Sequence, residues 1–522
     1  MTWQNSAITI TTFMPILGAV VILCMPKEKD RTIRGLAILF TGIALALSIA
    51  IAIGFNYSQA GLQYVLNVQW IPVIGARYHV GIDGISLPLY LLTFLLSFLC
   101  AVYSWRYIPE AGRTKAFLSL MLLLEVGMAG TFIAFDLILF FVFWELVLVP
   151  MYFLIGIWGS ANREYASIKF FLFTLFGSAL MLLSFLAMFF LSKVHTFDIV
   201  TLSKLHGAGI VHGTQLLVFA GMFLGFAIKV QMFPFHTWLP DAHTEAPTVG
   251  SVLLAAIMLK LGTYGFIRIA LPMLPSAAQS WAPWIGLLAV IGIIYGALCC
   301  LAQRDMKRLI AFSSVAHMGF VMLGIATLTT FGINAAIFGM VAHGLITGML
   351  FFLAGSIQER YGTREMSRLG GLLTQAPHLG WLLGFSAMAS LGLPGLAGFW
   401  GEFPSILSSY DPKLPFGLWG GLDGTLWTFR TYMVIAAIGT VLAAGYLLWM
   451  FQRVAMGSVK PEFEHAHIHD VHVSEWIAWA PLLLLIVALG LYPQLLFKIT
   501  DPAVKELVRG MGVALHFASR SL

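Results

Sequence analysis

The sequence predicts an all-α polytopic membrane protein with fourteen transmembrane helices. Of its 522 residues, 59% are hydrophobic and only 10% are charged, whereas a soluble chain carries about 25% charged residues. Aromatic residues make up 14% of the chain, which suits a lipid-facing surface with interfacial rings. A soluble enzyme of this composition could not cover its surface with polar groups, so that class is excluded.

Fourteen stretches are apolar and long enough to cross a bilayer, which takes about 20 residues. They are 6–24, 33–54, 85–105, 115–133, 136–157, 165–191, 214–234, 247–270, 282–302, 306–327, 332–357, 379–408, 430–452 and 476–497. No polar stretch between them is long enough for a separate soluble domain, so we expect a single membrane domain, 1–522. Alternating residues at 64–70 and 78–82 predict a small external β-hairpin.

The distribution of Lys and Arg over the loops predicts the orientation. Of 29 cations, 17 fall on one side of the predicted spans and 10 on the other. The positive-inside rule places the first side in the cytoplasm, with both termini outside. We therefore expect a bacterial inner membrane, or an equivalent energy-transducing membrane, as its location. The net charge of +6 includes no basic run longer than two residues, so nucleic acid is not expected as a partner.

Several ionisable residues interrupt the apolar runs, where a charge costs about 2.5–3.5 kcal/mol and usually marks an ion or proton path. They are Glu125, Glu145, Lys229, Lys260, His317, His343 and Glu402. A single such group could instead belong to a packing ion pair, or be a lysine that snorkels to the interface. Lys260 cannot snorkel, because at least ten predicted helical residues flank it on each side.

A proton route explains the whole set better than packing does. Burial disfavours the charged form of amines and carboxyls, so such groups change charge at modest cost. Histidine titrates near neutral pH without any shift. A lysine beside a glutamate can hold two protonation patterns of similar energy, which a neighbouring charge can tip.

Two of the predicted helices are expected to break. The seventh has Lys229 ahead of Pro234, and the twelfth has a Gly- and Pro-rich run at 392–398 ahead of Glu402. Broken helices in corresponding positions of two halves point to a transport site at a repeat interface. We predict two five-helix repeats, 115–270 and an inverted 282–452, with flanking helices in 1–105 and 476–497. Ordinary kinking is the alternative, because Gly and Pro are common in spanning helices.

Four motifs resemble one known family. They are KVQMFPFHTWLPDAHTEAPTVGSVLLAAIMLKLGTYGFIR (Lys229–Arg268), FWELVLVPMYFLIGIWG (Phe143–Gly159), QRDMKRLIAFSSVAHMGF (Gln303–Phe320) and GIDGISLPL (Gly81–Leu89). The chain resembles the antiporter-like membrane subunits of the proton-pumping NADH–quinone oxidoreductase, respiratory complex I. Glu402 stands where two of the three such subunits carry a lysine, which favours the M type. The lack of a long lateral helix after the last span argues against the L type, and fourteen helices argue against the N type.

The resemblance implies a non-redox subunit that translocates protons through a buried Glu/Lys/His axis, driven by quinone reduction in other subunits. It pairs Glu145 with Lys229 and places Lys260 at the centre of the axis. The implied translocation residues are Glu145, Lys229, Lys260, Glu402, His317 and His343, with Glu125, His236 and His243 as accessory candidates. No cofactor is expected in this chain; FMN, iron–sulfur clusters and quinone are expected in partner subunits. The implied partners are neighbouring L- and N-type chains and, through them, the peripheral redox arm.

Other interpretations of the same residues stay open. A subunit of a multi-chain cation/proton antiporter or of a membrane-bound hydrogenase would share the broken helices and lysines. His236 and His243 could cap a helix as readily as carry protons. The histidines at 465–472 could chelate a metal, but a solvated loop is favoured. The four cysteines include no CxxC pair, so no metal or iron–sulfur site is expected, and His317 and His343 lack the motif of attached haem.

Overall fold

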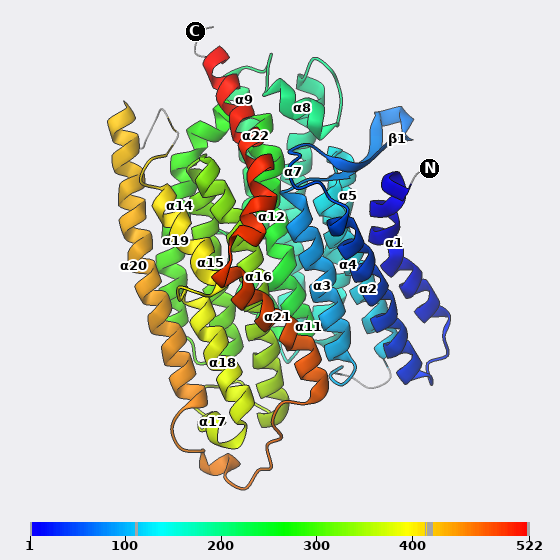
Figure 1. Ribbon diagram of the computed structural model, residues 1–522, viewed down its shortest axis with the longest axis vertical. Coiled ribbons are helices and arrows are strands. Elements are labelled where there is room, and N and C mark those ends of the chain that lie inside the picture. The colour runs from blue at the N-terminus through cyan, green and yellow to red at the C-terminus, as the bar shows by residue number, and fades with distance from the viewer. Residues whose placement is uncertain (1–2, 110–112, 413, 415–420, 519–522) are drawn as a thin grey trace.

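The computed structural model describes residues 3–109, 113–412, 414 and 421–518. Most helices run side by side along the long axis of the molecule, as a bundle (Figure 1). The hairpin, α8 and the C-terminal helix lie at its upper end in that view, whereas α17 and the long loop after α20 lie at its lower end. The predicted all-α membrane fold is confirmed.

The first half of the chain consists of eleven α-helices, one 3-10 helix and two strands in the described residues. They are α1 (Trp3–Cys24), α2 (Asp30–Ile53), β1 (Gln63–Ile71), η1 (Pro72–Ile74), β2 (Ala76–Ile82), α3 (Ser86–Ser104), α4 (Thr114–Ile133), α5 (Leu137–Leu146), α6 (Leu148–Trp158), α7 (Arg163–Leu191), α8 (Ile199–Leu205), α9 (His212–Val230), α10 (Trp238–Glu245) and α11 (Thr248–Leu253).

The second half begins with two short π-helices inside a longer helix. Its elements are η2 (Leu254–Met258), α12 (Leu259–Gly265), η3 (Phe266–Ala270), α13 (Leu271–Met273), α14 (Pro275–Leu301), α15 (Met306–Ala326), α16 (Thr330–Tyr361), α17 (Leu372–Gln375), α18 (Pro377–Ser390), α19 (Ala397–Ser408), α20 (Gly421–Ala455), η4 (Pro461–Phe463), α21 (Val473–Leu491) and α22 (Gln494–Ala518).

Thirteen helices in the described part of the chain are long and apolar enough to cross a membrane. Each coincides with a predicted stretch, within a few residues. The remaining stretch, 379–408, forms two shorter helices, α18 and α19, with a break between them. Gly392 and Gly395 in the break have φ of 80° and 95°, which favours glycine and ends a right-handed helix. The predicted break is confirmed, while the grouping into inverted repeats stays a prediction.

The other predicted break is also confirmed, at a slightly different place. Helix α9 ends at Val230, where Gln231 adopts a left-handed φ of 64°. The chain then turns through Pro234 and resumes as the short helix α10. The helix therefore stops four residues ahead of the proline, because Pro234 has no N–H to donate to the carbonyl oxygen of Val230 and its ring would clash with that carbonyl.

The hairpin and the C-terminal helix lie at the same end of the bundle (Figure 1). Strands β1 and β2 pair antiparallel, with Leu66 opposite Val80, as the alternating pattern predicts. A further helix, α22, follows the last span over 25 residues, but it packs on α16 of the same chain and is not the long lateral helix of the L type. This helix folds back on its own chain: Asn334 of α16 donates to Asp501 over 3.1 Å.

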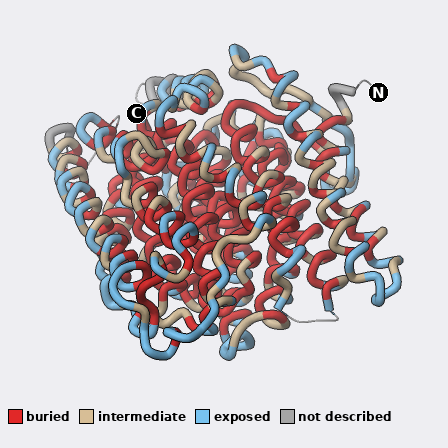
Figure 2. The backbone as a smooth tube through the Cα atoms, turned by 60° about the horizontal axis from the view of Figure 1, so that its bottom comes forward, coloured by how far each residue is buried: buried red, intermediate tan, exposed pale blue. Residues whose placement is uncertain are grey.

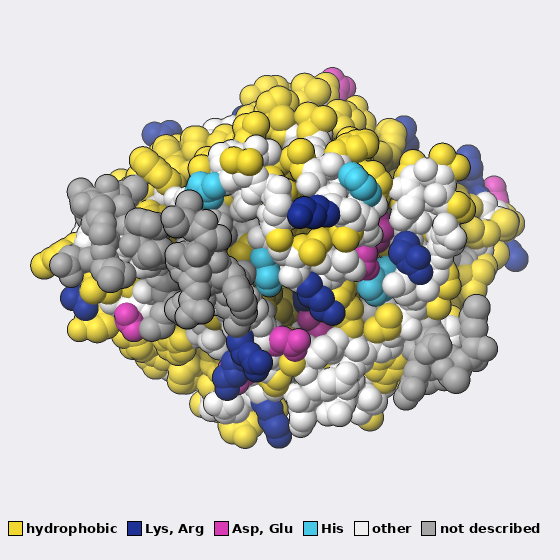
Figure 3. All heavy atoms as spheres, turned by 90° about the horizontal axis from the view of Figure 1, so that it is seen from above, with side chains coloured by type: hydrophobic (Ala, Val, Ile, Leu, Met, Phe, Trp, Pro, Cys, Tyr) yellow, Lys and Arg dark blue, Asp and Glu magenta, His cyan; other side chains and the backbone are white. Residues whose placement is uncertain are grey.

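Burial is concentrated in the helices that carry the ionisable residues. Figure 2 shows buried backbone through the middle of the molecule and exposed segments around it. The apolar windows of α15 and α16 are 100% buried, while that of α20 is only 39% buried. In Figure 3, which looks at the end with the hairpin and α22, charged and histidine side chains gather toward the centre and hydrophobic ones form much of the rim. The periphery is thus suited to lipid, and the polar groups lie inside.

A buried ion pair connects two helices near the hairpin. Arg268, in η3, donates to both carboxylate oxygens of Asp83, at 2.5 and 2.6 Å, and its guanidinium lies over the ring of Phe135. Both side chains are largely buried, with exposed fractions of 12% and 5%. Neighbouring Gly84 could not carry a Cβ, since that atom would lie 2.1 Å from the Ile499 carbonyl oxygen. This turn therefore joins η3 to the start of α3 and to α22.

We expect Arg268→Met to destabilise the protein by about 3–5 kcal/mol, because it leaves Asp83 as a buried charge without its partner. The double variant Arg268→Met/Asp83→Asn should lose less, since no unpaired charge remains. Heat-induced unfolding of the detergent-solubilised protein measures both. A single variant no less stable than the double one would contradict this prediction.

At the opposite end, Asp470 caps the first turn of α18. Its carboxylate accepts from the backbone N–H groups of His378 and Leu379, over 3.0 and 3.1 Å, and contacts the His378 ring at 2.7 Å. Burial raises the pKa of Asp470, but these hydrogen bonds outweigh it and hold that pKa below its usual value of 3.8. The cap positions the first half of the broken helix.

The cap should weaken in acid. Because the pKa of Asp470 is lowered in the folded state, its contribution is complete above the usual carboxyl pKa and is lost as the pH falls through the lowered value. Below about pH 4, we expect faster hydrogen exchange of the His378 and Leu379 amides, relative to their intrinsic rates. Asp470→Asn should show no such pH dependence, and an equal dependence in that variant would rule out the cap as the cause.

Candidate functional site

Lys260 lies at the centre of a helix whose winding changes on both sides of it. The helix runs continuously from α11 to α13, but η2 and η3 are π-helical turns that flank the α-helical segment holding Lys260. Such turns inside helices often occur at functional sites. The Lys260 Nζ donates to the Ala255 carbonyl oxygen in η2 over 2.6 Å, and the residue is fully buried.

His343 on α16 is the side chain that Lys260 meets. Its Nδ1 lies 2.7 Å from the Lys260 Nζ, a hydrogen-bonding distance. Its other ring nitrogen, Nε2, is buried and has no hydrogen-bond partner in the described residues. That free nitrogen faces the side of the ring away from the lysine, so a further proton carrier can approach it there.

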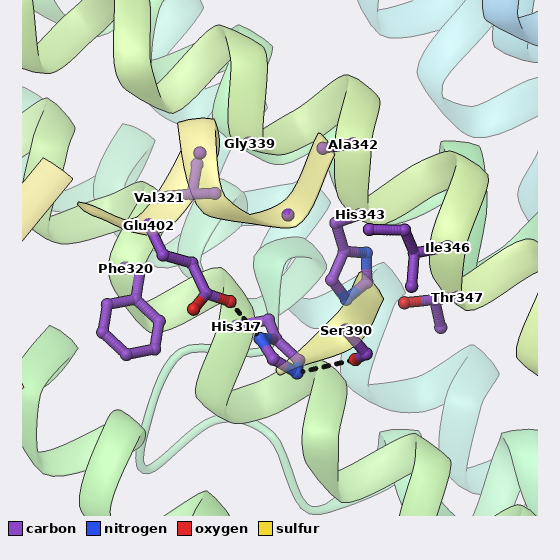
Figure 4. A pocket seen from close by; sticks show the side chains of 12 residues that line it. His317, Phe320, Val321, Gly339, Ala342, His343, Ile346, Thr347, Ser390 and Glu402 are labelled. Carbon is purple, nitrogen blue, oxygen red and sulfur yellow. Dashed lines mark hydrogen bonds and ion pairs between the residues drawn. The ribbon is translucent and has the colours of Figure 1, made fainter. Parts of the chain in front are cut away.

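His317 on α15 lies between His343 and Glu402. The two imidazole centroids are 5.9 Å apart, and His317 Nδ1 lies 2.5 Å from Glu402 Oε1. The hydroxyl groups of Ser390 and Tyr446 both lie 3.2 Å from His317 Nε2. Figure 4 shows Glu402, His317 and Ser390 joined in this order, with His343 beside them. The imidazole therefore has polar partners on both nitrogens.

A small cavity lies between these groups. It has a volume of about 20 Å³ and is lined by His317, His343, Ser390, Thr347 and Glu402, among others. A water needs about 10–15 Å³ measured in this way, with two or more polar partners. The cavity can therefore hold about one water between the two imidazoles, where no direct hydrogen bond joins them.

Close helix packing holds Glu402 in this place. A Cβ on Gly401 would lie 2.5 Å from the Gly339 Cα, so these two glycines let α19 and α16 approach closely. A Cβ on Gly392, in the break, would lie 3.2 Å from a Glu402 carboxylate oxygen. The broken helix thus leaves room for the carboxylate at the end of α18.

Glu145 and Lys229 form a second group, apart from the first. Lys229 is the penultimate residue of α9, and its Nζ lies 5.0 Å from the Trp144 ring centroid. The Glu145 carboxylate is within electrostatic range of Lys229. Among the described residues, however, the two side chains do not form an ion pair within 4.0 Å. One Glu145 oxygen, Oε1, is buried and has no hydrogen-bond partner in the described part of the chain. The expected pairing of Glu145 with Lys229 is therefore not a direct contact in the described structure.

The three accessory candidates lie in different surroundings. Glu125 on α4 is fully buried, and neither carboxyl oxygen has a hydrogen-bond partner in the described residues. His236, in the turn after α9, lies against Tyr295 with ring centroids 5.0 Å apart. His243 on α10 stacks on Phe351, with ring centroids 4.7 Å apart, and both of its ring nitrogens are buried without a hydrogen-bond partner among the residues that the structure describes.

Lys307 is a buried amine that the sequence analysis missed, because it counted this residue among the cytoplasmic cations. The side chain is only 2% exposed, and its Nζ donates to the Ala246 carbonyl oxygen. Its charge acts on His243, as does that of Lys260. Lys307 starts an apolar stretch, where a cation usually lies at the interface, so nothing in the sequence signalled its burial.

A larger cavity lies beside Lys307, at the end of the bundle where the loops after α3 and α6 lie. Its volume is about 170 Å³, and Lys307, Glu359, Gln358 and Ser160 contribute polar groups to its lining. Glu359 is exposed and lies on the last turns of α16. The cavity therefore extends from a surface carboxylate to a buried amine. Among all the described residues, no group of three or more His, Cys, Asp and Glu side chains is arranged to hold a metal ion.

Comparison with known proteins identifies close relatives over nearly the whole chain. The chain is 40% identical to NADH-quinone oxidoreductase subunit M of Rickettsia bellii, covering 96% of this chain and 98% of that one. It is 39% identical to the subunit M of Rhodobacter capsulatus, covering 97% of both. The expected likeness to M-type subunits is confirmed.

Solved structures give the same result. Respiratory complex I from Thermus thermophilus contains a chain with a TM-score of 0.85 and 29% identity, covering 97% of this chain and 99% of that one. A chain of the Mrp complex from a Dietzia species shares the fold, with a TM-score of 0.82 and 21% identity, covering 98% of this chain and 100% of that one. The family model described as NADH:quinone oxidoreductase/Mrp antiporter, TM, matches residues 134–425, and the chain belongs to that family.

Proposed function

We propose that this chain is a proton-translocating membrane subunit of an NADH–quinone oxidoreductase. The observation that carries the proposal is the buried run from Lys260 through His343 and His317 to Glu402, with hydrogen-bonding distances of 2.7 and 2.5 Å at its two ends. Titratable groups in contact inside an apolar bundle are costly, and such residues mark proton relays. The names of the relatives at 38–40% identity support the same assembly.

The relay works by exchange of protons between neighbours. Lys260 and His343 share one hydrogen bond, and His317 and Glu402 share another. A water in the small cavity would bridge the two imidazoles, since each has polar atoms facing it. Arginine could not take part, because it does not release its proton in proteins.

The Glu145–Lys229 group supplies the trigger in this proposal. Because no short ion pair fixes them, the lysine amine can shift toward the carboxylate or toward Trp144. In this proposal, a charge change there alters the electrostatic field at Lys260, whose helix α12 packs against α9. Moving one charge across the membrane costs about 2.3 kcal/mol per 100 mV, so quinone reduction in other subunits must drive the step.

Protons enter, in this proposal, through the cavity beside Lys307. Glu359 collects them at the surface, Lys307 carries them inward, and His243 lies within electrostatic range of both Lys307 and Lys260. Glu402 then releases them on the side that carries the hairpin. This direction agrees with the orientation that the Lys and Arg distribution predicts, with both termini on the outer side of the bacterial inner membrane.

The redox chemistry belongs to other subunits in this proposal, as do FMN, the iron–sulfur clusters and the quinone site. The proposed partners are L- and N-type antiporter-like chains in the membrane and the peripheral redox arm beyond them. The five-helix repeats 115–270 and 282–452 would each supply one broken helix, α9–α10 and α18–α19.

A subunit of a multi-chain cation/proton antiporter is the second candidate, because a chain of the Mrp complex has the same fold. Polypeptides that remain with this chain after mild detergent extraction distinguish the two. Flavin- and iron–sulfur-containing partners would support the oxidoreductase, whereas a set made only of membrane chains would support the antiporter.

We expect Lys229→Ala and Glu145→Ala each to reduce proton pumping strongly while the complex still assembles, because each removes one member of the trigger group. Pumping is measured with a pH-sensitive dye in membrane vesicles, and assembly by native electrophoresis. Lys204→Ala, which removes an exposed lysine from α8, is the control and should pump normally. If the two variants assemble and pump like the control, these roles are wrong.

Lys307 allows a sharper test, because a proton carrier and a structural cation respond differently. Lys307→Met should slow pumping by about 10²-fold or more, as expected for loss of a positioned proton-transfer group. Lys307→Arg keeps a charge and a donor for the Ala246 carbonyl oxygen, but cannot release a proton. The Lys307→Arg variant should therefore assemble normally but pump as slowly as Lys307→Met.

The matched control is Arg308→Met, at the next residue, whose side chain is 45% exposed. It should leave pumping close to that of the unmodified protein. Normal pumping by Lys307→Arg would show that Lys307 acts only as a structural cation, and would contradict this uptake route.

A further inference from the structure

A hollow lined by arginines lies at the end of the bundle where α2 begins, α3 ends and α21 begins. Its volume is about 640 Å³, and it is lined by Asp30, Arg31, Arg34, Trp105, Arg106 and His472, together with the first residues of α21. The lower ends of these three helices lie near one another in Figure 1. None of these groups belongs to the proposed proton route. We refer to this site as the arginine hollow.

Arg34 is fixed in position and forms the wall of the arginine hollow. Its Nε donates to Asp30 over 2.7 Å, and its Nη1 donates to the carbonyl oxygens of Ser104 and Trp105, over 3.0 and 2.7 Å. These bonds join the start of α2 to the end of α3. Since Arg34 neutralises Asp30, the remaining charge of the hollow comes from its other arginines.

Arg31 and Arg106 supply that charge. Both are exposed, and neither guanidinium donates a hydrogen bond or forms an ion pair within the part of the chain that the structure describes. Burial and the charge of Arg106 lower the pKa of neighbouring His472 below its usual value. A capping box at the start of α21 occupies the backbone N–H groups of His472 and Glu475, and leaves those of Val473 and Ser474 without a partner among the described residues. Positive charge and free donors therefore converge on one hollow, which favours an anion.

The edge of the arginine hollow is apolar. Trp105 is 40% exposed, Val473 is 75% exposed, and Ile477, one turn further along α21, is 52% exposed. These side chains lie where the apolar stretches of α3 and α21 reach the membrane boundary, a position in which tryptophan is enriched. A free anion gains nothing from contact with these apolar side chains, whereas the acyl chains of a phospholipid can pack against them.

We propose that the arginine hollow binds the phosphate headgroup of an acidic phospholipid. Arg31, Arg106 and the start of α21 hold the phosphodiester, and Trp105, Val473 and Ile477 contact its acyl chains. Basic pockets between spanning helices on the cytoplasmic side suit such headgroups. The hollow lies on the side that carries 17 of the 29 cations in the predicted orientation, which agrees with this position.

The test uses the whole detergent-purified assembly and a phosphatidylglycerol that carries a photoreactive group on one acyl chain. After irradiation, mass spectrometry of peptides identifies the labelled residues. We expect labels near Trp105 and Val473, and far fewer from a phosphatidylcholine probe with the same chains. In Arg31→Ala/Arg106→Ala, half-maximal labelling should need about thirtyfold more probe, since each arginine near a headgroup contributes roughly fivefold.

The matched control, Arg163→Ala/Arg304→Ala, removes two exposed arginines from the same face but outside the hollow. It should label like the unmodified protein, and the thermal midpoints of both double variants should agree, which excludes unfolding. Equal labelling by phosphatidylcholine, or by the two double variants, would overturn the proposal. So would displacement by inorganic phosphate, which indicates a free anion, or crosslinks to a neighbouring chain in place of lipid, which indicate a protein interface.

Discussion

A bilayer offers no water to a buried charge, so partners within the protein stabilise several of the ionisable side chains inside this chain. This constraint explains which helices meet. Lys260 on α12 contacts His343 on α16, Arg360 on α16 pairs with Glu475 on α21, and Lys307 on α15 contacts the carbonyl of Ala246. Polar contacts, including those of the proposed proton route, therefore also determine which helices pack against one another. The apolar residues around them need only match lipid or one another in shape.

Irregular backbone occurs where these polar groups gather. The π-turns beside Lys260 lie in a largely buried part of the bundle, whereas each break includes exposed residues, such as Pro234 after α9 and Leu393 after α18. A break frees carbonyl and N–H groups and moves side chains off a regular helical face. Glu402 occupies space that Gly392 leaves open, and Lys260 bonds to a carbonyl within η2. Local irregularity and the proposed route are thus two aspects of one arrangement.

The sequence predicted the features that depend on composition and local chemistry. Apolar length placed thirteen continuous spans, and the Gly–Pro run at 392–395 placed the break in the remaining one. Features that depend on tertiary contact could not be predicted. The burial of Lys307 is decided by a carbonyl 61 residues away, and no residue type signals a π-turn. The separation of Glu145 and Lys229 is set by how α5 and α9 pack, which their motifs do not encode. An amphipathic segment such as α22 falls below the apolarity of a span, and so escaped a search for spans.

The narrow cavity between His317 and His343 has a consequence for energy storage. A membrane that holds a potential cannot contain a permanently water-filled channel, because ions would flow back through the channel and dissipate the potential. Space for about one solvent molecule would let a proton pass in the proposed route, but gives no hydrated cation room to follow. The membrane can thus stay insulated while protons cross it. Entry of a water molecule into this constriction, and its loss, would determine when protons can pass.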